Sequence, residues 1–142
     1  MPLDKFNLSR NDFHISSASA FRDLLKENYF VDVTLACEDG QQVKPHKVIL
    51  SYSSLFFKNI LIKNLHPKPL ILLAGIKFED LNALITFIYL GEVSLAENDL
   101  GSFLHASEVL KIEGLSNYCR MFQSVIKQSK REGHEEVNEP GT

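Results

Sequence analysis

The chain has 142 residues, of which 44% are hydrophobic and 23% charged, and its formal net charge at pH 7 is −3. This length and composition predict one globular domain with one core. The acidic balance argues against direct binding of nucleic acid, since domains that grip phosphates usually carry a basic surplus. The longest apolar runs are far too short to cross a membrane, and the first residues lack the apolar core of a signal peptide. We therefore expect a nuclear or cytosolic protein without a membrane partner.

The first thirty residues predict a short strand followed by a helix. Phe6 and Leu8 are two positions apart, which suits a strand. Residues 16–29 have the pattern of a helix that Ser16 or Ser17 caps. The apolar stripe of this helix consists of Phe21, Leu24 and Leu25.

The middle of the chain predicts a β-hairpin and then a pair of helices. Residues 30–39 are rich in β-branched side chains, and the Asp-Gly pair at 39–40 is a strong hairpin signal. The returning strand is expected over 41–46. Two short helices should follow over 46–53 and 54–61.

Serine and proline mark the next boundaries. Ser53 or Ser54 is placed to cap the second short helix. The two prolines within 66–69 exclude a helix there. Residues 70–73, with the sequence Leu-Ile-Leu-Leu, then predict a short buried strand.

The second half of the chain predicts three helices and one further strand. The helices are expected over 78–91, 97–111 and 113–126, and the strand over 92–95. From Lys127 the composition becomes polar and charged, with Val137 as the single apolar residue. We therefore expect a domain of residues 1–126 and a mobile polar tail or linker of residues 127–142. The whole order predicts an α+β fold.

The residues that could react have ordinary explanations. Cys37 and Cys119 give neither a disulfide framework nor a zinc spacing, so both are expected to be buried in a reducing compartment. A nucleophile and base formed by Cys37 and His46 would lack a third group to orient the histidine. The five histidines show no paired ligand spacing. We predict no enzyme activity, no metal and no cofactor.

Asp32 is the one polar residue that stands out. It lies inside a predicted strand, where an isolated buried carboxylate would be costly. Two interpretations stay open. Either Asp32 is an edge residue exposed to solvent, or it faces a basic group such as Lys47 or His46 at the start of the next helix.

Residues 30–61 resemble the BTB/POZ domain. The family pattern is an aspartate-bearing strand, a hairpin, a His-Lys step into a helix and an aromatic pair, and it is matched here by Asp32, Val33, His46, Lys47, Leu50, Ser51, Phe56 and Phe57. The match continues through "LNALITFIYLGEV" and "FLHASEVLKIEGLSNYC", so it covers about residues 6–123. The opening "FNLSRNDF" is similar to the tramtrack-type group of insect zinc-finger transcription factors and chromatin-architecture proteins. That group usually has Cys-Trp where this chain has Ser9 and Arg10.

The resemblance implies a BTB/POZ fold, which is a small mixed sheet flanked by a cluster of short helices, with an N-terminal strand swapped between two chains. It implies a homodimer, or a higher multimer, of a nuclear transcription or chromatin regulator, with other BTB domains or transcriptional cofactors as further partners. The charged pocket at the dimer interface would contain Asp32, His46 and Lys47. The apolar interface would contain Phe6, Leu8, Phe13, Ile15, Phe21, Leu24 and Leu25.

The alternative is a substrate adaptor of a cullin-based ubiquitin ligase, another role of BTB domains. Such adaptors commonly carry an apolar-X-Glu motif after the aromatic pair. The segment that follows the pair here, residues 58–69, contains no acidic residue. The sequence therefore favours the self-association role.

Overall fold

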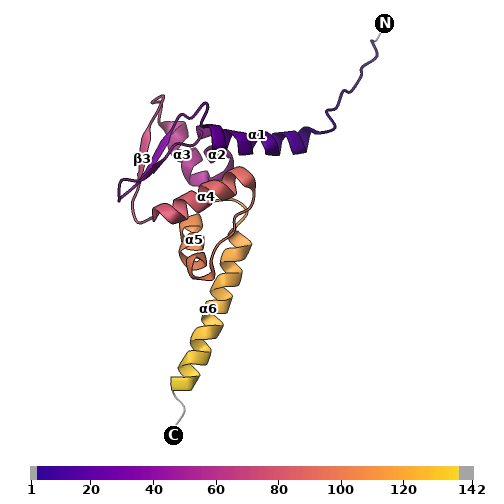
Figure 1. The fold of residues 1–142 in the computed structure, drawn as a ribbon. Helices are drawn as coiled ribbons and strands as arrows, with labels where there is room; N and C mark the ends of the chain where they lie inside the picture. The colour runs from indigo at the N-terminus through magenta and orange to yellow at the C-terminus, as the bar shows by residue number, and fades with distance from the viewer. Residues whose placement is uncertain (1–2, 138–142) are drawn as a thin grey trace.

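The computed structural model describes residues 3–137 (Figure 1). The small sheet lies at one side of the body, α1 extends away from the upper part of the body, and α6 runs downward from its lower part. The helices are α1 (Phe13–Glu27), α2 (Lys47–Ser53), α3 (Leu55–Lys63), α4 (Phe78–Leu90), α5 (Glu97–Val109) and α6 (Ser116–Val137). No helix within the described residues is both long and apolar enough to cross a bilayer.

The sheet has three strands in the order β2-β1-β3. The hairpin partner β2 (Gln42–Val43) runs antiparallel to β1 (Thr34–Cys37), with Leu35 opposite Val43. On the other side, β3 (Leu70–Leu73) runs parallel to β1. The parallel pairing requires a crossover, which the α2–α3 pair provides. The predicted α+β fold with a small mixed sheet is confirmed.

One apolar core lies between the sheet and the helices. Strand β1 is buried along most of its length, and α4 and α5 each bury one face. The two cysteines are free and buried, as the sequence predicts, and burial raises the pKa of both thiols. The largest side chains with almost no exposure are Phe57, Phe103, Leu35, Leu50, Leu81, Leu84 and Leu110.

Ser54 separates the two short helices and links them to α5. Its Oγ accepts a hydrogen bond from the Phe57 N–H, which caps α3, and donates one to the Leu110 carbonyl. The hydroxyl is completely buried, so both bonds matter for its stability there. Of the two serines that the sequence offers as caps, Ser54 is the one used.

Two predicted strands are absent from the described residues. Residues 6–8 are extended but belong to no sheet, and residues 92–95 are also outside the three strands. The physical reason is that a strand needs a neighbour to bond its backbone, and neither segment has one within residues 3–137. The exchange of the N-terminal strand between two chains stays a prediction.

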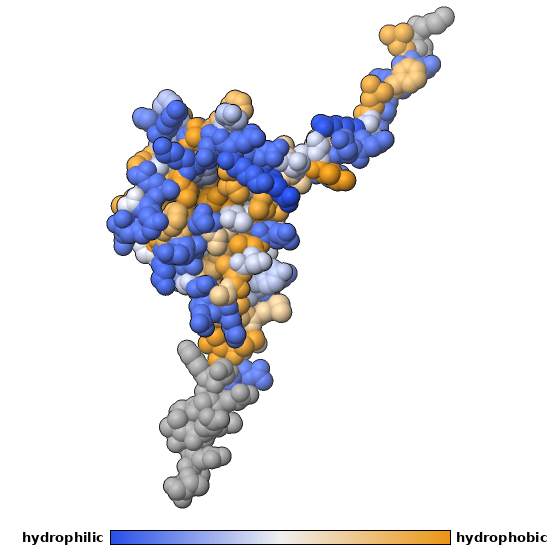
Figure 2. Space-filling view, viewed as in Figure 1, coloured by the Kyte–Doolittle hydropathy of each residue, from blue (hydrophilic) through white to orange (hydrophobic). Residues whose placement is uncertain are grey.

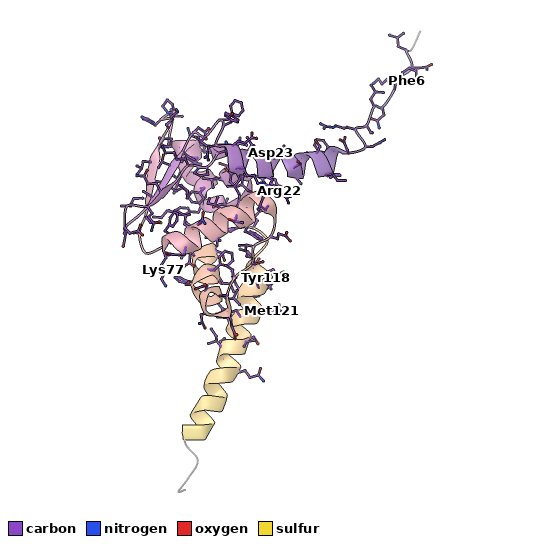
Figure 3. All side chains as sticks on the ribbon, viewed as in Figure 1. Phe6, Arg22, Asp23, Lys77, Tyr118 and Met121 are labelled. Atoms are coloured by element: carbon purple, nitrogen blue, oxygen red, sulfur yellow. The ribbon has the colours of Figure 1, made fainter. Side chains whose placement is uncertain are left out.

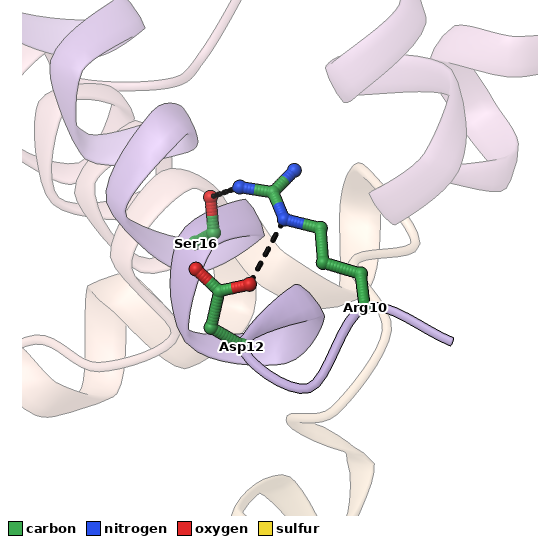
Figure 4. A network of polar contacts seen from close by, with 3 residues as sticks. All are labelled: Arg10, Asp12 and Ser16. Carbon is green, nitrogen blue, oxygen red and sulfur yellow. Dashed lines mark hydrogen bonds and ion pairs between the residues drawn. The ribbon is translucent and has the colours of Figure 1, made fainter. Parts of the chain in front are cut away.

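The first helix begins three residues earlier than the sequence predicts. Asp12 is its N-cap residue, so Ser16 and Ser17 lie inside the helix. Arg10 bridges this start, because its guanidinium donates to the Asp12 carboxylate at 2.9 Å and to the Ser16 hydroxyl at 2.6 Å (Figure 4). The two charged side chains are exposed, so the ion pair adds little stability.

The last helix continues beyond its predicted end at residue 126. It runs to Val137, because lysine, glutamine, arginine and glutamate are good helix formers and the chain has no proline between residue 116 and Pro140. Part of the predicted tail is therefore helical, while residues 138–142 lie outside the described residues. The boundary of the domain at 126 stays a prediction.

Removal of residues 130–142 is expected to leave the melting temperature and the oligomer mass unchanged. This segment contains a single apolar residue, so it has almost no surface to bury against the domain. Differential scanning calorimetry and light scattering of the shortened chain would check this. A drop of several degrees would show that the segment docks onto the body.

Candidate functional site

A buried polar cluster joins the start of α2 to the end of α4. His46 is only 7% exposed, and its Nε2 lies 2.5 Å from the Tyr29 carbonyl oxygen. A carbonyl can only accept, so Nε2 carries a proton, and in the neutral imidazole Nδ1 is then the acceptor. The Tyr89 hydroxyl lies 2.6 Å from Nδ1 and donates to it, while the same oxygen accepts from the His46 main-chain N–H at 2.8 Å.

Tyr89 is therefore the centre of this cluster. Burial raises the pKa of its hydroxyl to about 12, and the negative charge of Asp32 adds to the effect. The neutral hydroxyl can donate to His46, whereas a phenolate cannot. The sequence analysis quoted Tyr89 only as part of a family motif. A tyrosine in an apolar helix is itself a signal, because a buried hydroxyl needs a partner.

We expect the contribution of Tyr89 to be lost in strong alkali. Its folded-state pKa is raised above the unfolded value of 10.0, so its stabilising effect is complete below pH 10 and falls as the pH rises through about 12. The free energies of unfolding of the wild type and of Tyr89→Phe should therefore converge over this range in urea titrations at fixed protein concentration. Other titrating groups are common to both chains and cancel. A constant difference would contradict the assignment.

Asp32 binds the start of α2 from the strand side. His46, the N-cap residue of α2, offers no side-chain cap, and the Asp32 carboxylate accepts from the Lys47 main-chain N–H at 2.8 Å instead. A carboxylate at this position also faces the positive end of the helix. Both residues are partly buried. The interpretation of Asp32 as a plain exposed edge residue is therefore not what the structure shows.

The side chain of Lys47 points elsewhere. Its ammonium donates to the carbonyls of His66 and Pro67, at 2.9 and 3.1 Å, and so fastens α2 to the proline-containing turn. The direct pair of charged side chains that the sequence suggested is thus replaced by a main-chain contact. The Asp32 carboxylate gains a charge-assisted hydrogen bond from the helix N–H, and the lysine ammonium remains available for the two carbonyls.

Asp32→Ala is expected to lower the free energy of unfolding by about 1 to 2 kcal/mol, the range for the loss of a helix cap. Asp32→Asn should cost less, because the amide oxygen still accepts from the Lys47 N–H. Glu113→Gln removes the same charge at an exposed loop residue and is the control. Chemical unfolding measures all three. Equal values for Asp32→Ala and the control would contradict the capping role.

The residues predicted for an apolar interface divide into two groups. Phe6 and Leu8 are 87% and 92% exposed. They lie on an N-terminal arm, residues 3–11, which leads away from the rest of the domain (Figures 1 and 3). Phe13 and Ile15, in the first turn of α1, are also exposed. The second group lies at the other end of α1 and packs against the core, and it consists of Phe21, Leu24 and Leu25.

A groove of about 560 Å³ lies beside this second group. Leu24 and Leu25 of α1 form one wall, and Ile85 and Tyr89 of α4 form another. Figure 2 shows apolar surface on this face of the body, surrounded by polar atoms. The structure thus brings Leu24, Leu25 and His46 to one groove, while it leaves the arm separate.

The described residues contain no group of three His, Cys, Asp or Glu side chains arranged to hold a metal ion. The polar cluster around Tyr89 has all its bonds satisfied internally, and the large exposed side chains are apolar. Exposed apolar surface of this extent is typical of an interaction surface. The fold and the site together define an α+β protein-interaction domain.

Comparison with known proteins specifies the class further. A profile of the BTB/POZ domain matches residues 21–127, so the chain belongs to the BTB/POZ family. It is 45% identical over 111 residues to Broad-complex core protein isoforms 1/2/3/4/5 of Drosophila melanogaster, which is 78% of this chain and 15% of that protein. It is 36% identical over 116 residues to Protein tramtrack, alpha isoform, of the same organism, which is 82% of this chain and 14% of that protein.

A third relative differs in length. Longitudinals lacking protein-like of Drosophila melanogaster is 41% identical over 112 residues, which cover 79% of this chain and 87% of that protein. The chain therefore spans less than a sixth of Broad-complex and tramtrack but most of this shorter relative. The resemblance to the tramtrack-type group that the sequence suggested is confirmed.

Proposed function

We propose that this domain joins two copies of its chain within a nuclear regulator of transcription or chromatin. The arm carries this proposal. Phe6 and Leu8 are almost fully exposed in a single chain, although burying a large apolar side chain contributes about 1.5 to 3 kcal/mol. A second copy of the same chain is the partner that is always present at equal concentration, and a two-fold dimer would bury both arms.

A second segment supports the same arrangement. Residues 92–95 have the sequence pattern of a strand but pair with nothing in the described residues. The arm has the same pattern and the same deficit. Two unpaired strand-like segments satisfy each other when the arm of one copy lies beside residues 92–95 of the other. An interface made by such an exchange is typically apolar and large.

The similar proteins support the part of the proposal that concerns regulation of transcription. Broad-complex, tramtrack and bric-a-brac belong to the transcription factors of Drosophila, and their presence among the similar proteins supports a nuclear role. A domain that pairs two chains raises the local concentration of any attached DNA-binding unit at a second site. Strengthened occupancy of neighbouring sites would then follow without direct contact between this acidic domain and DNA.

Co-expression of two differently tagged copies tests the pairing. Purification through one tag should recover the other tag in equal amount, and chains mixed only after purification should exchange slowly if the arms are swapped. Failure to recover the second tag would refute the proposal. The same experiment with a tagged cullin tests the adaptor role, and we expect no recovery, because residues 58–69 contain no acidic residue.

A further inference from the structure

The sheet ends in a strand whose outer edge is unprotected. Strand β3 pairs with β1 on one side, and within the described residues no strand pairs with it on the other. Native edge strands usually carry a charge, a proline or a bulge that prevents further pairing. Residues 70–73, Leu-Ile-Leu-Leu, contain neither a charge nor a proline. The free edge of β3 is therefore open to the backbone of another strand.

The hydrogen bonds between β1 and β3 show which residues face this edge. The Thr34 N–H donates to the Pro69 carbonyl at 3.0 Å, and Thr34 lies opposite Leu70. A parallel ladder uses alternate residues of a strand, so Ile71 follows Pro69 in bonding β1. The main-chain N–H and carbonyl groups of Leu70 and Leu72 therefore point away from β1, toward the free edge.

The side chains of the same two leucines are exposed. Leu70 and Leu72 are 59% and 60% exposed, and residues two apart along a strand lie on one face of the sheet. Ile71 lies on the opposite face and packs against the core. Apolar side chains beside an open backbone edge are the combination that an added strand covers, since its backbone bonds the edge and its side chains cover the face.

We propose that the β3 strands of two copies pair antiparallel about a two-fold axis, with Leu70 of one copy opposite Leu72 of the other. In this register both leucines occupy hydrogen-bonded positions, so the two strands exchange their free N–H and carbonyl groups. The leucines of both copies then share one face of a continuous sheet. The arm and β3 lie on different sides of the body, so this contact joins arm-exchanged pairs of chains into larger assemblies (Figure 1).

The charges at the two ends of β3 favour a second copy as the occupant. Lys68 is exposed just before the strand and falls opposite Ala74 of the second copy in this register. Within each copy, Glu38 lies beside Ala74 on the same face, because these residues follow the paired ends of β1 and β3. The α-carbons of Lys68 and of Glu38 in the second copy are then two strand spacings apart, about 10 Å. Their side chains meet over the small Ala74, and the two-fold axis repeats this ion pair.

A lysine on the free edge tests the contact. Leu72→Lys is expected to raise the dissociation constant for the joining of pairs at least about tenfold, because it places an uncompensated charge in the new ladder. Leu72 is exposed in the single chain, so the variant is expected to fold. Val125→Lys is the matched control, because Val125 is 63% exposed on α6, which lies far from β3 (Figure 1). Sedimentation velocity of the full chain over a concentration series measures these constants.

An exchange of charges distinguishes a second copy from any other occupant. Lys68→Glu and Glu38→Lys are each expected to raise the same constant about tenfold, because both ion pairs become pairs of like charges. A mixture of the two variants should regain about the wild-type constant. In the mixed contact the two substituted residues face each other with opposite charges, and so do the two unchanged residues. Hydrogen–deuterium exchange adds a readout, in which the amides of Leu70 and Leu72 are protected in the wild type and in the mixture but not in either variant alone.

The outcomes separate this contact from the pairing through the arms. A wild-type chain that stays a pair at every concentration, with the amides of Leu70 and Leu72 unprotected, would overturn only the β3 contact. Larger assemblies that Leu72→Lys leaves unchanged would do the same. Charge variants whose mixture does not recover would overturn the two-fold register and indicate another occupant, such as an apolar peptide. A wild-type pair that Leu72→Lys separates into single chains would support the β3 contact and overturn the pairing through the arms.

Discussion

Removal of residues 1–11 is expected to weaken the dimer at least a hundredfold and to lower its melting temperature, while the isolated fold stays intact. The shortened chain keeps Asp12, the N-cap of α1. Within one chain, Phe6 and Leu8 are 87% and 92% exposed, so the arm adds almost nothing to the stability of a monomer. Any loss of stability on its removal must come from contacts with another chain.

The size of the effect follows from the burial of the two side chains. Each contributes about 1.5 to 3 kcal/mol when buried, and a two-fold dimer buries the pair twice. The cost of ordering the two arms offsets part of this gain, and the strand hydrogen bonds offset part of that cost. Every 1.4 kcal/mol that remains is a factor of ten in the dissociation constant, so a hundredfold effect corresponds to about 2.8 kcal/mol. The apolar surface that the arms would cover in a pair is then open to solvent, so aggregation at high concentration is expected.

Single substitutions provide a matched control for this truncation. Leu8→Ser is expected to weaken the dimer in the same direction. Leu65→Ser removes a leucine with the same 92% exposure from the loop before β3 and should have no effect. A truncated chain that stays dimeric with an unchanged melting temperature would show that the arm is not exchanged.

Tyr89→Phe is expected to lower the free energy of unfolding by about 2 to 4 kcal/mol. The substitution keeps the ring and removes one oxygen. That oxygen accepts from the His46 main-chain N–H and donates to Nδ1 of the same residue, so two buried polar groups lose their partner at once. Each such orphan costs about 1 to 3 kcal/mol.

Chemical unfolding at neutral pH and fixed protein concentration measures this change. Tyr52→Phe is the control, because Tyr52 is 77% exposed on α2 and loss of its hydroxyl should alter stability by less than about 0.5 kcal/mol. If Tyr89→Phe lowers the free energy of unfolding no more than the control does, water replaces the lost hydroxyl and the cluster is accessible to solvent. A large loss would show that the cluster fixes α2 against α4.

Much of the fold could be predicted from local patterns. The helical spacing of Leu81, Leu84 and Ile85 marked α4, and the Asp-Gly turn marked the β1–β2 hairpin, because these signals depend only on neighbouring residues. The strands predicted at 6–8 and 92–95 are absent from the described residues. A strand pattern states which residues share a face, but not which chain supplies the neighbour.

The sequence predicted which residues form the site better than it predicted the contacts between them. Asp32, His46 and Lys47 do come together, but the carboxylate binds a main-chain N–H, and the lysine binds the carbonyls of His66 and Pro67. A sequence shows which side chains are charged, and charged side chains of opposite sign suggest an ion pair. They do not show free helix N–H groups or carbonyls, which exist only after the backbone has folded. The tyrosine hydroxyl in an apolar helix was a signal that Tyr89 has a partner, but one of its partners, the His46 N–H, is a main-chain group that no sequence pattern marks.

The central claim is that two copies of this chain associate through their arms. Light scattering coupled to size exclusion, over a dilution series down to micromolar concentration, measures it most directly. The account predicts a mass near twice the 16.1 kDa of one chain, or a larger even multiple, that persists on dilution and falls toward one chain when residues 1–11 are removed. A mass of one chain for the intact protein at micromolar concentration would contradict the account.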